Sequence, residues 1–370
     1  MKLLVLVMSV LFLTPAHSQT CSITINQQKE LLIVDPSVVD DPRATRGVWS
    51  FAHIMAVLNA HKHDLSDFTL HWLQEWTTKQ TVNGFAVEPR PTVNNLINGW
   101  PKLPNGKLDM SRAPFRLLAI VNRVDLSSAP AGEGRFVYGL LDPQGRPLPF
   151  TVIFEFVLPV SQFNNPVPVI AWAKTWHQLG NIPFGESFNQ ALEKITGAFA
   201  RPGTINQVRT NEIVFGPTWQ MREFTLGLNG HLESSPTKQM PDEAFVDSPD
   251  LANWIRLNAE TINAGAHVVP LRTIGGTGHA PRSWAPSLAN DPNPAIRSAR
   301  RNFSIQTCTG CHSSDTNTAF LHVEPRAAGP SKISNFLIAD LNLRVEKMKQ
   351  MLCFTPGEVA RRLRMSTRVH

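Results

Sequence analysis

The amino-acid sequence predicts an α+β body with a mainly antiparallel sheet, followed by a mainly α-helical C-terminal region. Three observations predict this arrangement: apolar residues at helical spacing over 47–100, β-rich runs between Gly and Pro junctions over 115–226, and a return to helical spacing after residue 295. The 370 residues are 42% hydrophobic and 17% charged, which excludes a disordered chain. This length predicts two domains, or one large domain with an appendage.

Helices are expected in the first hundred residues, where apolar side chains recur every three or four positions. Residues 47–63 and 67–81 follow this spacing, and Ser66 is expected to cap the second helix. Residues 92–100 form a third predicted helix. The run 31–34 is a short predicted strand.

The body continues with runs rich in β-branched and aromatic residues, which predict an antiparallel sheet from four segments: 115–124, 135–141, 151–158 and 167–176. A further hairpin is predicted from two later segments, 211–215 and 221–226. Helical spacing returns in two stretches of the body, 188–199 and 249–264.

The C-terminal region begins after a predicted linker at 275–294 that is rich in Gly, Pro, Ser and Asn. Helices are expected over four further segments: 295–303, 333–340, 343–352 and 356–365. The predicted division of the chain is a leader at 1–18, a body at 19–288 and a C-terminal region at 289–370.

The N-terminus is typical of a secretory signal peptide. Lys2 precedes an apolar run at 3–13, and Ala16 and Ser18 supply the small residues that a signal peptidase needs, so cleavage is predicted after Ser18. The run is too short for a bilayer span, which takes about 20 residues; a terminal anchor or a buried helix is the alternative. We therefore expect a periplasmic or secreted protein without an integral membrane span in the mature chain.

The charge pattern gives no sign of nucleic-acid binding. The net charge is +6, and the basic residues are dispersed along the chain. A nucleic-acid site would need a concentrated basic stripe with interleaved aromatic residues. A mildly positive surface favours docking with an acidic partner instead.

One motif carries chemistry: Cys308-Thr309-Gly310-Cys311-His312, which has the C-x-x-C-H spacing of covalent haem attachment. The two thiols add to the two vinyl groups on one edge of the porphyrin. Two intervening residues let one turn of chain present both sulfurs to that edge. The next residue then places its imidazole under the iron as the proximal ligand.

This motif and the helix before it resemble the c-type cytochromes over roughly residues 295–370. The resemblance implies haem c with iron as the cofactor, thioether bonds at Cys308 and Cys311, and His312 as the proximal ligand. It implies a distal ligand too, for which Met348, Met351, Met365 and His322 are candidates. A loop Met, which such domains often use, is not evident, and this departure puts simple electron carriage in doubt.

Residues around the motif are candidates for holding the haem. Arg326 is the preferred partner for a propionate, because a guanidinium pairs bidentately with a carboxylate. Other candidates are arginines of the preceding helix and aromatic residues that could line the haem: Arg297, Arg300, Arg301, Phe303, Phe320 and Phe336. The polar string 206–212 either lines a pocket facing the haem or is an ordinary loop.

Several alternatives stay open at this point. Cys308 and Cys311 could form a disulfide, a thioredoxin-type dithiol, or a zinc site with His312 and His322. If haem takes both, Cys21 and Cys353 remain and could pair, with two buried free thiols as the alternative.

Three functions fit the sequence. The first is electron transfer by an exported haem protein, whose redox partner protein or small-molecule substrate the sequence does not identify. The second is an oxidoreductase of the haem peroxidase or oxygenase type, which needs a polar group above an open iron site. The third is a non-haem binding protein with a Cys308–Cys311 disulfide.

Overall fold

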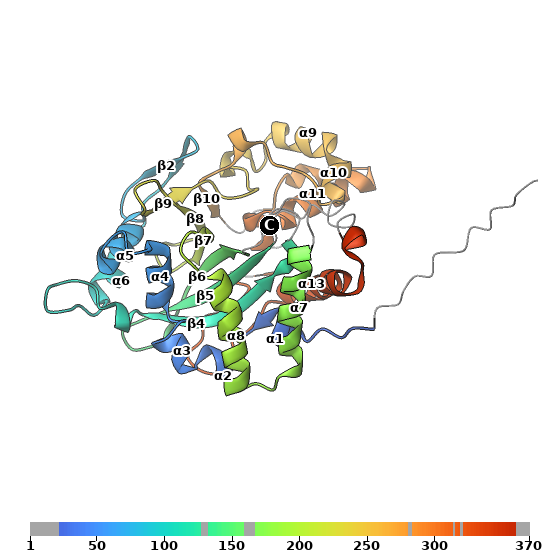
Figure 1. Cartoon of the computed structure of the whole chain (residues 1–370). Helices are drawn as coiled ribbons and strands as arrows, with labels where there is room; N and C mark the ends of the chain where they lie inside the picture. Colours follow the sequence, from blue (N-terminus) through green and yellow to red (C-terminus); the bar gives the residue numbers. More distant parts are fainter. Residues whose placement is uncertain are drawn as a thin grey trace, which may run out of the picture.

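The computed structural model describes residues 22–126, 132–158, 167–279, 283–313, 315–318 and 321–359. In this part of the chain, an eight-stranded antiparallel sheet lies at the centre of an α+β fold, which confirms the predicted class (Figure 1). Seven strands follow one another across the sheet in the order β1 (Leu32–Ile33), β4 (Phe115–Arg123), β5 (Glu133–Leu141), β6 (Pro147–Val157), β7 (Ile205–Glu212), β8 (Gln220–Leu226) and β10 (Thr277–His279). The eighth strand, β9 (Leu232–Ser235), also pairs with β8. A separate hairpin joins β2 (Gln80–Val82) to β3 (Phe85–Val87).

The two faces of the large sheet differ in chemistry, because successive side chains of a strand point to opposite faces. The strand register places one apolar row on the first face, formed by Phe136, Phe154, Val208 and Phe224. The neighbouring row, on the second face, is mixed and contains Val137, Ile153, Arg209 and Glu223. The sheet therefore has an apolar face and a partly polar face.

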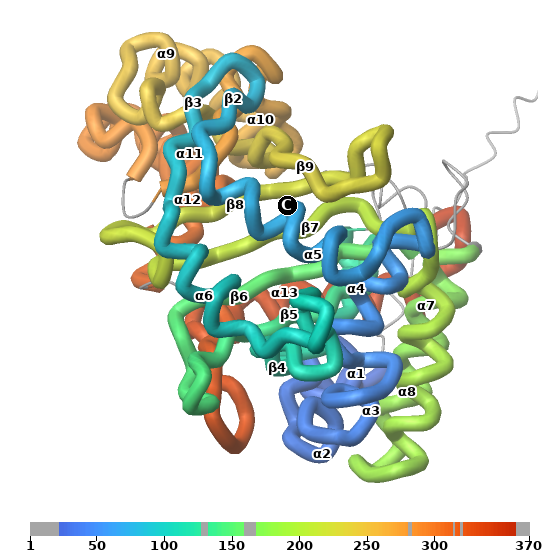
Figure 2. Tube along the Cα trace, turned by 90° about the vertical axis from the view of Figure 1, so that its left-hand side faces the viewer, coloured from blue at the N-terminus to red at the C-terminus, as the bar shows by residue number. Residues whose placement is uncertain are grey.

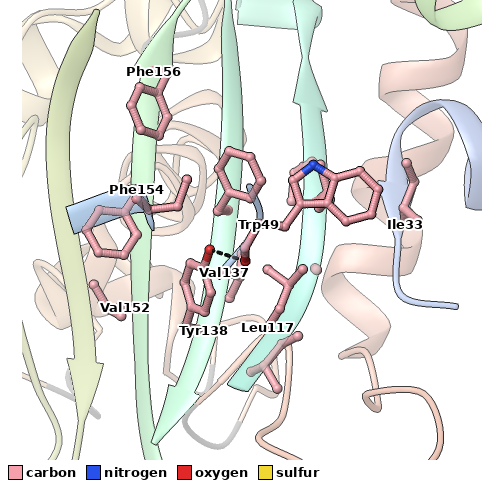
Figure 3. Packing of buried hydrophobic residues seen from close by; sticks show 14 of the residues in the cluster. Ile33, Trp49, Leu117, Val137, Tyr138, Val152, Phe154 and Phe156 are labelled. Carbon is pink, nitrogen blue, oxygen red and sulfur yellow. Dashed lines mark hydrogen bonds between the residues drawn. The ribbon is translucent and has the colours of Figure 1, made fainter. Parts of the chain in front are cut away.

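Helices from the first two hundred residues pack on the apolar face: α1 (Gln27–Glu30), α2 (Pro36–Val39), α3 (Pro42–Thr45), α4 (Phe51–Asn59), α5 (Leu65–Gln74), α6 (Val93–Gly99) and α8 (Glu186–Phe199). Phe51 of α4 stacks on Phe115 with 4.1 Å between ring centroids. The Tyr138 hydroxyl donates to the Trp49 carbonyl at 2.8 Å (Figure 3), and the Trp49 indole donates to Thr196 of α8 at 2.8 Å. Most of the buried aromatic rings belong to this core.

A second, smaller core lies toward the other end of the molecule, where α9 (Pro249–Leu257), α10 (Ala259–Asn263) and α11 (Pro294–Ile305) group together (Figure 2). Ala299 and Phe303 of α11 pack there with Ile255 and Ile262. The following helices are α12 (Cys308–Cys311) and α13 (Asn335–Cys353), and α13 packs against α7 (Val167–Gln178). This core holds residues from both sides of position 288, where the domain boundary is predicted.

Several predicted elements differ from the structure. Residues 167–176 were expected to be a strand and form α7 instead. The predicted hairpin exists, but its first strand, β7, begins at Ile205 rather than 211. The predicted linker contributes β10 to the sheet edge, and 333–340 and 343–352 merge into the single helix α13. Asp64, rather than Ser66, caps α5.

Some predictions concern residues outside the described part of the chain: the signal peptide at 1–18, Cys21 and Phe320. Within the described residues, no helix combines the length and the apolar character that crossing a bilayer requires.

Candidate functional site

The cysteine motif forms the short helix α12, which begins at a well-anchored cap. Thr307 is the N-cap, and its hydroxyl accepts a hydrogen bond from the Gly310 backbone N–H at 3.0 Å. The same hydroxyl accepts from the buried indole of Trp284 at 2.7 Å and donates to the Ser304 carbonyl at 2.7 Å. The motif is therefore tied to the end of α11 and to the second core.

Gly310 is needed at its position because α12 passes close to the end of α11. A Cβ atom at residue 310 would lie closer than 3.0 Å to the backbone carbonyl of Ser304. The absence of a side chain thus lets the turn sit against α11 and directs Cys308, Cys311 and His312 toward the sheet.

These three residues line one cavity of about 180 Å³ between the partly polar face of the sheet, α12 and α13. This volume lies below the roughly 300–1,000 Å³ typical of cofactor and ligand pockets. The sheet wall is apolar at its centre, where Val121, Val137, Ile153 and Met221 face the space. On the other side Phe336 and Leu337 of α13 close the cavity. The walls therefore combine an apolar centre with the two thiols and the imidazole of the motif.

His312 is buried beside the cavity and has aromatic neighbours on two sides. Its ring stacks on Trp219 with centroids 4.9 Å apart and planes inclined by 28°. The His322 ring lies 4.3 Å away on a second side, and His322 Nε2 is 3.1 Å from Cys311 Sγ. The structure thus places Cys308, Cys311, His312 and His322 around one cavity.

The state of the cysteines bears on the three alternatives to haem attachment, which are a disulfide, a thioredoxin-type dithiol and a zinc site. Cys308 and Cys311 are free thiols, whereas Cys353 is part of a disulfide. Burial raises the pKa of the Cys308 thiol to about 12 and raises that of Cys311 further. A thioredoxin-type dithiol needs the opposite shift. Across the described residues, no three His, Cys, Asp or Glu side chains are arranged to hold a metal ion by themselves.

The charged residues that line the cavity are mostly cationic. One carboxylate, Asp340, lies among the described lining residues together with five cations: Arg123, Arg135, Arg209, Lys238 and Arg344. Arg344 pairs with Asp340 at 2.6 Å, and burial lowers its pKa to about 10. A ligand with two carboxylates would complement this lining.

Arg135 and Arg209 belong to a buried ion-pair network on the sheet. Both lie 3.2 Å from Glu155 Oε1, while Arg135 also pairs with Glu133 at 2.5 Å and Arg209 with Glu223 at 2.9 Å. Burial raises the pKa of Glu155, and the two guanidiniums offset this only in part. Burial acts likewise on Glu133, but the charge and hydrogen bond of Arg135 together with the charge of Arg123 outweigh it, so the pKa of Glu133 falls.

Other predicted site residues lie elsewhere. Arg326 forms a bidentate pair with Asp40 at 2.8 and 2.9 Å and is not among the residues that line the cavity. Met348 is buried in the main core, and Arg300 pairs with Asp315 at 2.8 Å. Of the predicted aromatic residues, Phe336 lines the cavity, and Phe303 packs in the second core. Arg297 and Arg301 are exposed.

Sequence reasoning missed the sheet wall, although one signal for it was present. The polar string 206–212 is part of β7, and its alternate residues Arg209 and Asn211 line the cavity beside the motif. Arg135 alternates with apolar residues in β5 in the same way. Polar or charged residues at alternate positions, Gln207, Arg209 and Asn211 in β7 and Glu133 and Arg135 in β5, could have identified this face.

Comparison with known proteins gives no match. No family model matches the chain, and neither a curated protein nor a solved structure matches it. The interpretation of the site therefore depends on the residues and the geometry described above.

Proposed function

We propose that this chain is an exported c-type haem protein that acts in electron transfer. One haem would be held covalently by Cys308 and Cys311, with His312 as the proximal iron ligand. The observation that carries the proposal is the cavity between the sheet, α12 and α13, onto which both thiols and this imidazole open. The bound haem would supply a centre that gains and loses one electron.

The chemistry of the cavity walls supports a porphyrin over other large ligands. A haem has vinyl groups at one edge, two propionates at another and an apolar body between them. The thiols, the arginines and the apolar sheet residues offer a partner for each part. Arg135 and Arg209 line the cavity, whereas Arg326 does not, and all three already pair with carboxylates of the protein.

The alternatives have less support. A disulfide interpretation fits poorly with two free thiols, and a zinc site fits poorly with the absence of a three-ligand cluster among the described residues. The predicted signal peptide supports export, and haem attachment to this motif is completed outside the cytoplasm. A periplasmic or secreted location and an acidic redox partner are parts of the proposal.

The test is a pyridine haemochrome spectrum of the protein after export from a host with cytochrome c maturation. We expect about one haem per chain, and the haem should stay with the polypeptide in acidified organic solvent. Cys308→Ser with Cys311→Ser should abolish retention, whereas Thr309→Ser, which keeps the hydroxyl at the variable motif position, should not. Haem that extracts freely from the wild-type protein would contradict the proposal.

A haem enzyme is the second candidate, and one observation favours it. The sheet wall across from the motif carries Thr151, Arg209 and Asn211, which supply polar groups of the kind that activate a ligand on iron. A high-spin ferric spectrum together with peroxide turnover, lost in Arg209→Met, would favour this function over electron transfer.

A further inference from the structure

Three histidine rings stack on one another where the turn between β8 and β9 meets α5. The His231 ring lies in the middle, with its centroid 3.9 Å from that of His63 and 4.1 Å from that of His71. The ring planes are inclined by 20° and 21°, so the rings lie face to face. His231 belongs to the β8–β9 turn, His63 to the α4–α5 loop and His71 to α5. The stack therefore joins three segments of the chain.

Hydrogen bonds hold the backbone on both sides of the stack. The Asn59 side chain donates to the His63 carbonyl at 2.6 Å and accepts from the His63 N–H at 3.0 Å. His63 Nε2 lies 2.9 Å from the Asn229 carbonyl, an acceptor to which it donates. In contrast, the buried Nδ1 atoms of His71 and His231 have no hydrogen-bond partner in the described part of the chain. Because both nitrogens of a protonated imidazole are donors, protonation would leave a buried N–H without an acceptor.

Charged groups reach the stack from each segment that packs around it. They are Lys62 of the loop, Asp64, Asp67 and Glu75 at or within α5, and Glu233 of β9. The carboxylates are engaged by other groups. Asp64 and Asp67 pair with Lys107 at 2.9 and 3.4 Å, and Glu75 accepts from the Ser234 hydroxyl at 2.7 Å. Glu233 Oε1 accepts from the Asn229 amide at 2.7 Å.

These surroundings disfavour a charged ring at the centre of the stack. Burial and the charges of His71 and His63 lower the pKa of His231, whereas the Glu233 charge acts in the opposite direction. If the turn leaves α5, the ring regains an ordinary pKa near about 6.5 and takes up a proton that the closed form does not bind. Opening is therefore favoured as the pH falls, by up to about tenfold per pH unit below that pKa.

We propose that His63, His231 and His71 form an acid-sensitive clasp, which holds the β8–β9 turn against α5 at neutral pH and releases it in acid. The released segment includes β9, which pairs with β8 on one side. On the other side the Ser234 N–H donates to Glu75 of α5 at 3.2 Å, and release breaks this bond. The clasp lies apart from the cavity beside the cysteine motif, so it does not depend on the proposed haem function.

The test is hydrogen exchange of the full chain at pH 7.5 and 5.5, read by mass spectrometry and corrected for the intrinsic effect of pH on exchange. Protection of residues 227–235 should fall about fivefold to tenfold in acid, while the central strands β5 and β6 keep theirs. His231→Phe retains a flat ring that cannot take up a proton, so its protection should not change with pH. His267→Phe is the matched control, because His267 packs against Phe303 in the second core. It should lose protection in acid as the wild type does.

Each outcome decides the role of the stack. Equal protection of residues 227–235 at the two pH values in the wild type would overturn the proposal, and so would an acid loss that persists in His231→Phe. Glu233→Gln covers the case in which His231→Phe does not fold, because it keeps an acceptor for Asn229 and removes the carboxylate charge. Its protection at pH 5.5 should be lower than that of the wild type, and an equal value would overturn the proposal.

Discussion

Replacing Gly310 by alanine tests whether the motif depends on the close approach of α12 to α11. The added methyl group would lie closer than 3.0 Å to the backbone of Ser304, which cannot swing aside as a flexible side chain could. The two helices would have to separate, although α11 is fixed in the second core by Ala299 and Phe303. Overpacking of this kind costs about 1–3 kcal/mol. We expect a loss near 3 kcal/mol, because the obstruction is backbone.

The same substitution elsewhere provides the control. Gly197 lies within α8, and a methyl group there would meet no atom within 4 Å. Gly197→Ala should therefore stabilise the protein by about 0.5–1 kcal/mol, through helix propensity alone. Urea unfolding followed by circular dichroism gives both free energies.

Haem content gives an independent measure of the same perturbation. Because α12 holds both cysteines and His312 follows it directly, Gly310→Ala should lower the ratio of covalent haem to protein after export, and Gly197→Ala should leave it unchanged. The reasoning would be refuted if Gly310→Ala unfolded within about 0.5 kcal/mol of the wild type and carried as much haem.

Three further predictions concern groups around the cavity and the second core. Arg135→Met leaves the buried Glu155 short of one cation and should lower the free energy of unfolding by about 3–5 kcal/mol. Adding Glu155→Gln should restore at least about 1 kcal/mol of this loss in urea unfolding. If the losses of the two changes were purely additive, the prediction would be contradicted. Burial lowers the pKa of His267 to about 4, so only the unfolded chain takes up a proton at this residue between about pH 6.5 and 4. The free energy of unfolding should therefore fall by about 3 kcal/mol over this pH range. His267→Phe should flatten this pH dependence in thermal melts, and an unchanged slope would refute the prediction. Trp219→Ala removes the ring stacked on His312 and should lower the free energy of unfolding by about 3–5 kcal/mol. Trp219→Phe should lower it much less, since the indole N–H has no partner among the described residues. Equal losses of stability for the two variants in calorimetry would show that stacking is unimportant.

Local patterns predicted most of the elements, and the main failure has a clear cause. Residues 167–176 contain Val167, Val169 and Ile170, and these β-branched residues favoured a strand. In α7 the buried residues Val169, Ile170, Ala173 and Trp176 recur at helical spacing and pack on the main core. Tertiary burial thus overrode β-propensity, and the helical period was present in the sequence.

The site was predictable only where it is local in sequence. Cys308, Cys311 and His312 are adjacent, so their spacing alone identified them. The arginines of the opposite wall come from β5 and β7, more than seventy residues apart, and meet only because both strands flank β6. Arg326 was predicted as a propionate partner because it is close to the motif in sequence. In the structure it pairs with Asp40, which lies nearly three hundred residues away along the chain.

The buried charges on the sheet bear on why the haem region is joined to so large a body. Ion pairs such as those of Arg135 and Arg209 contribute little net stability when buried, because desolvation offsets their attraction. The first face of the sheet, around Phe136 and Phe154, is apolar and carries the main core. Arg135 and Arg209, although paired with carboxylates, also line the cavity across from the motif. Under the proposed function, the body is therefore one wall of the haem site.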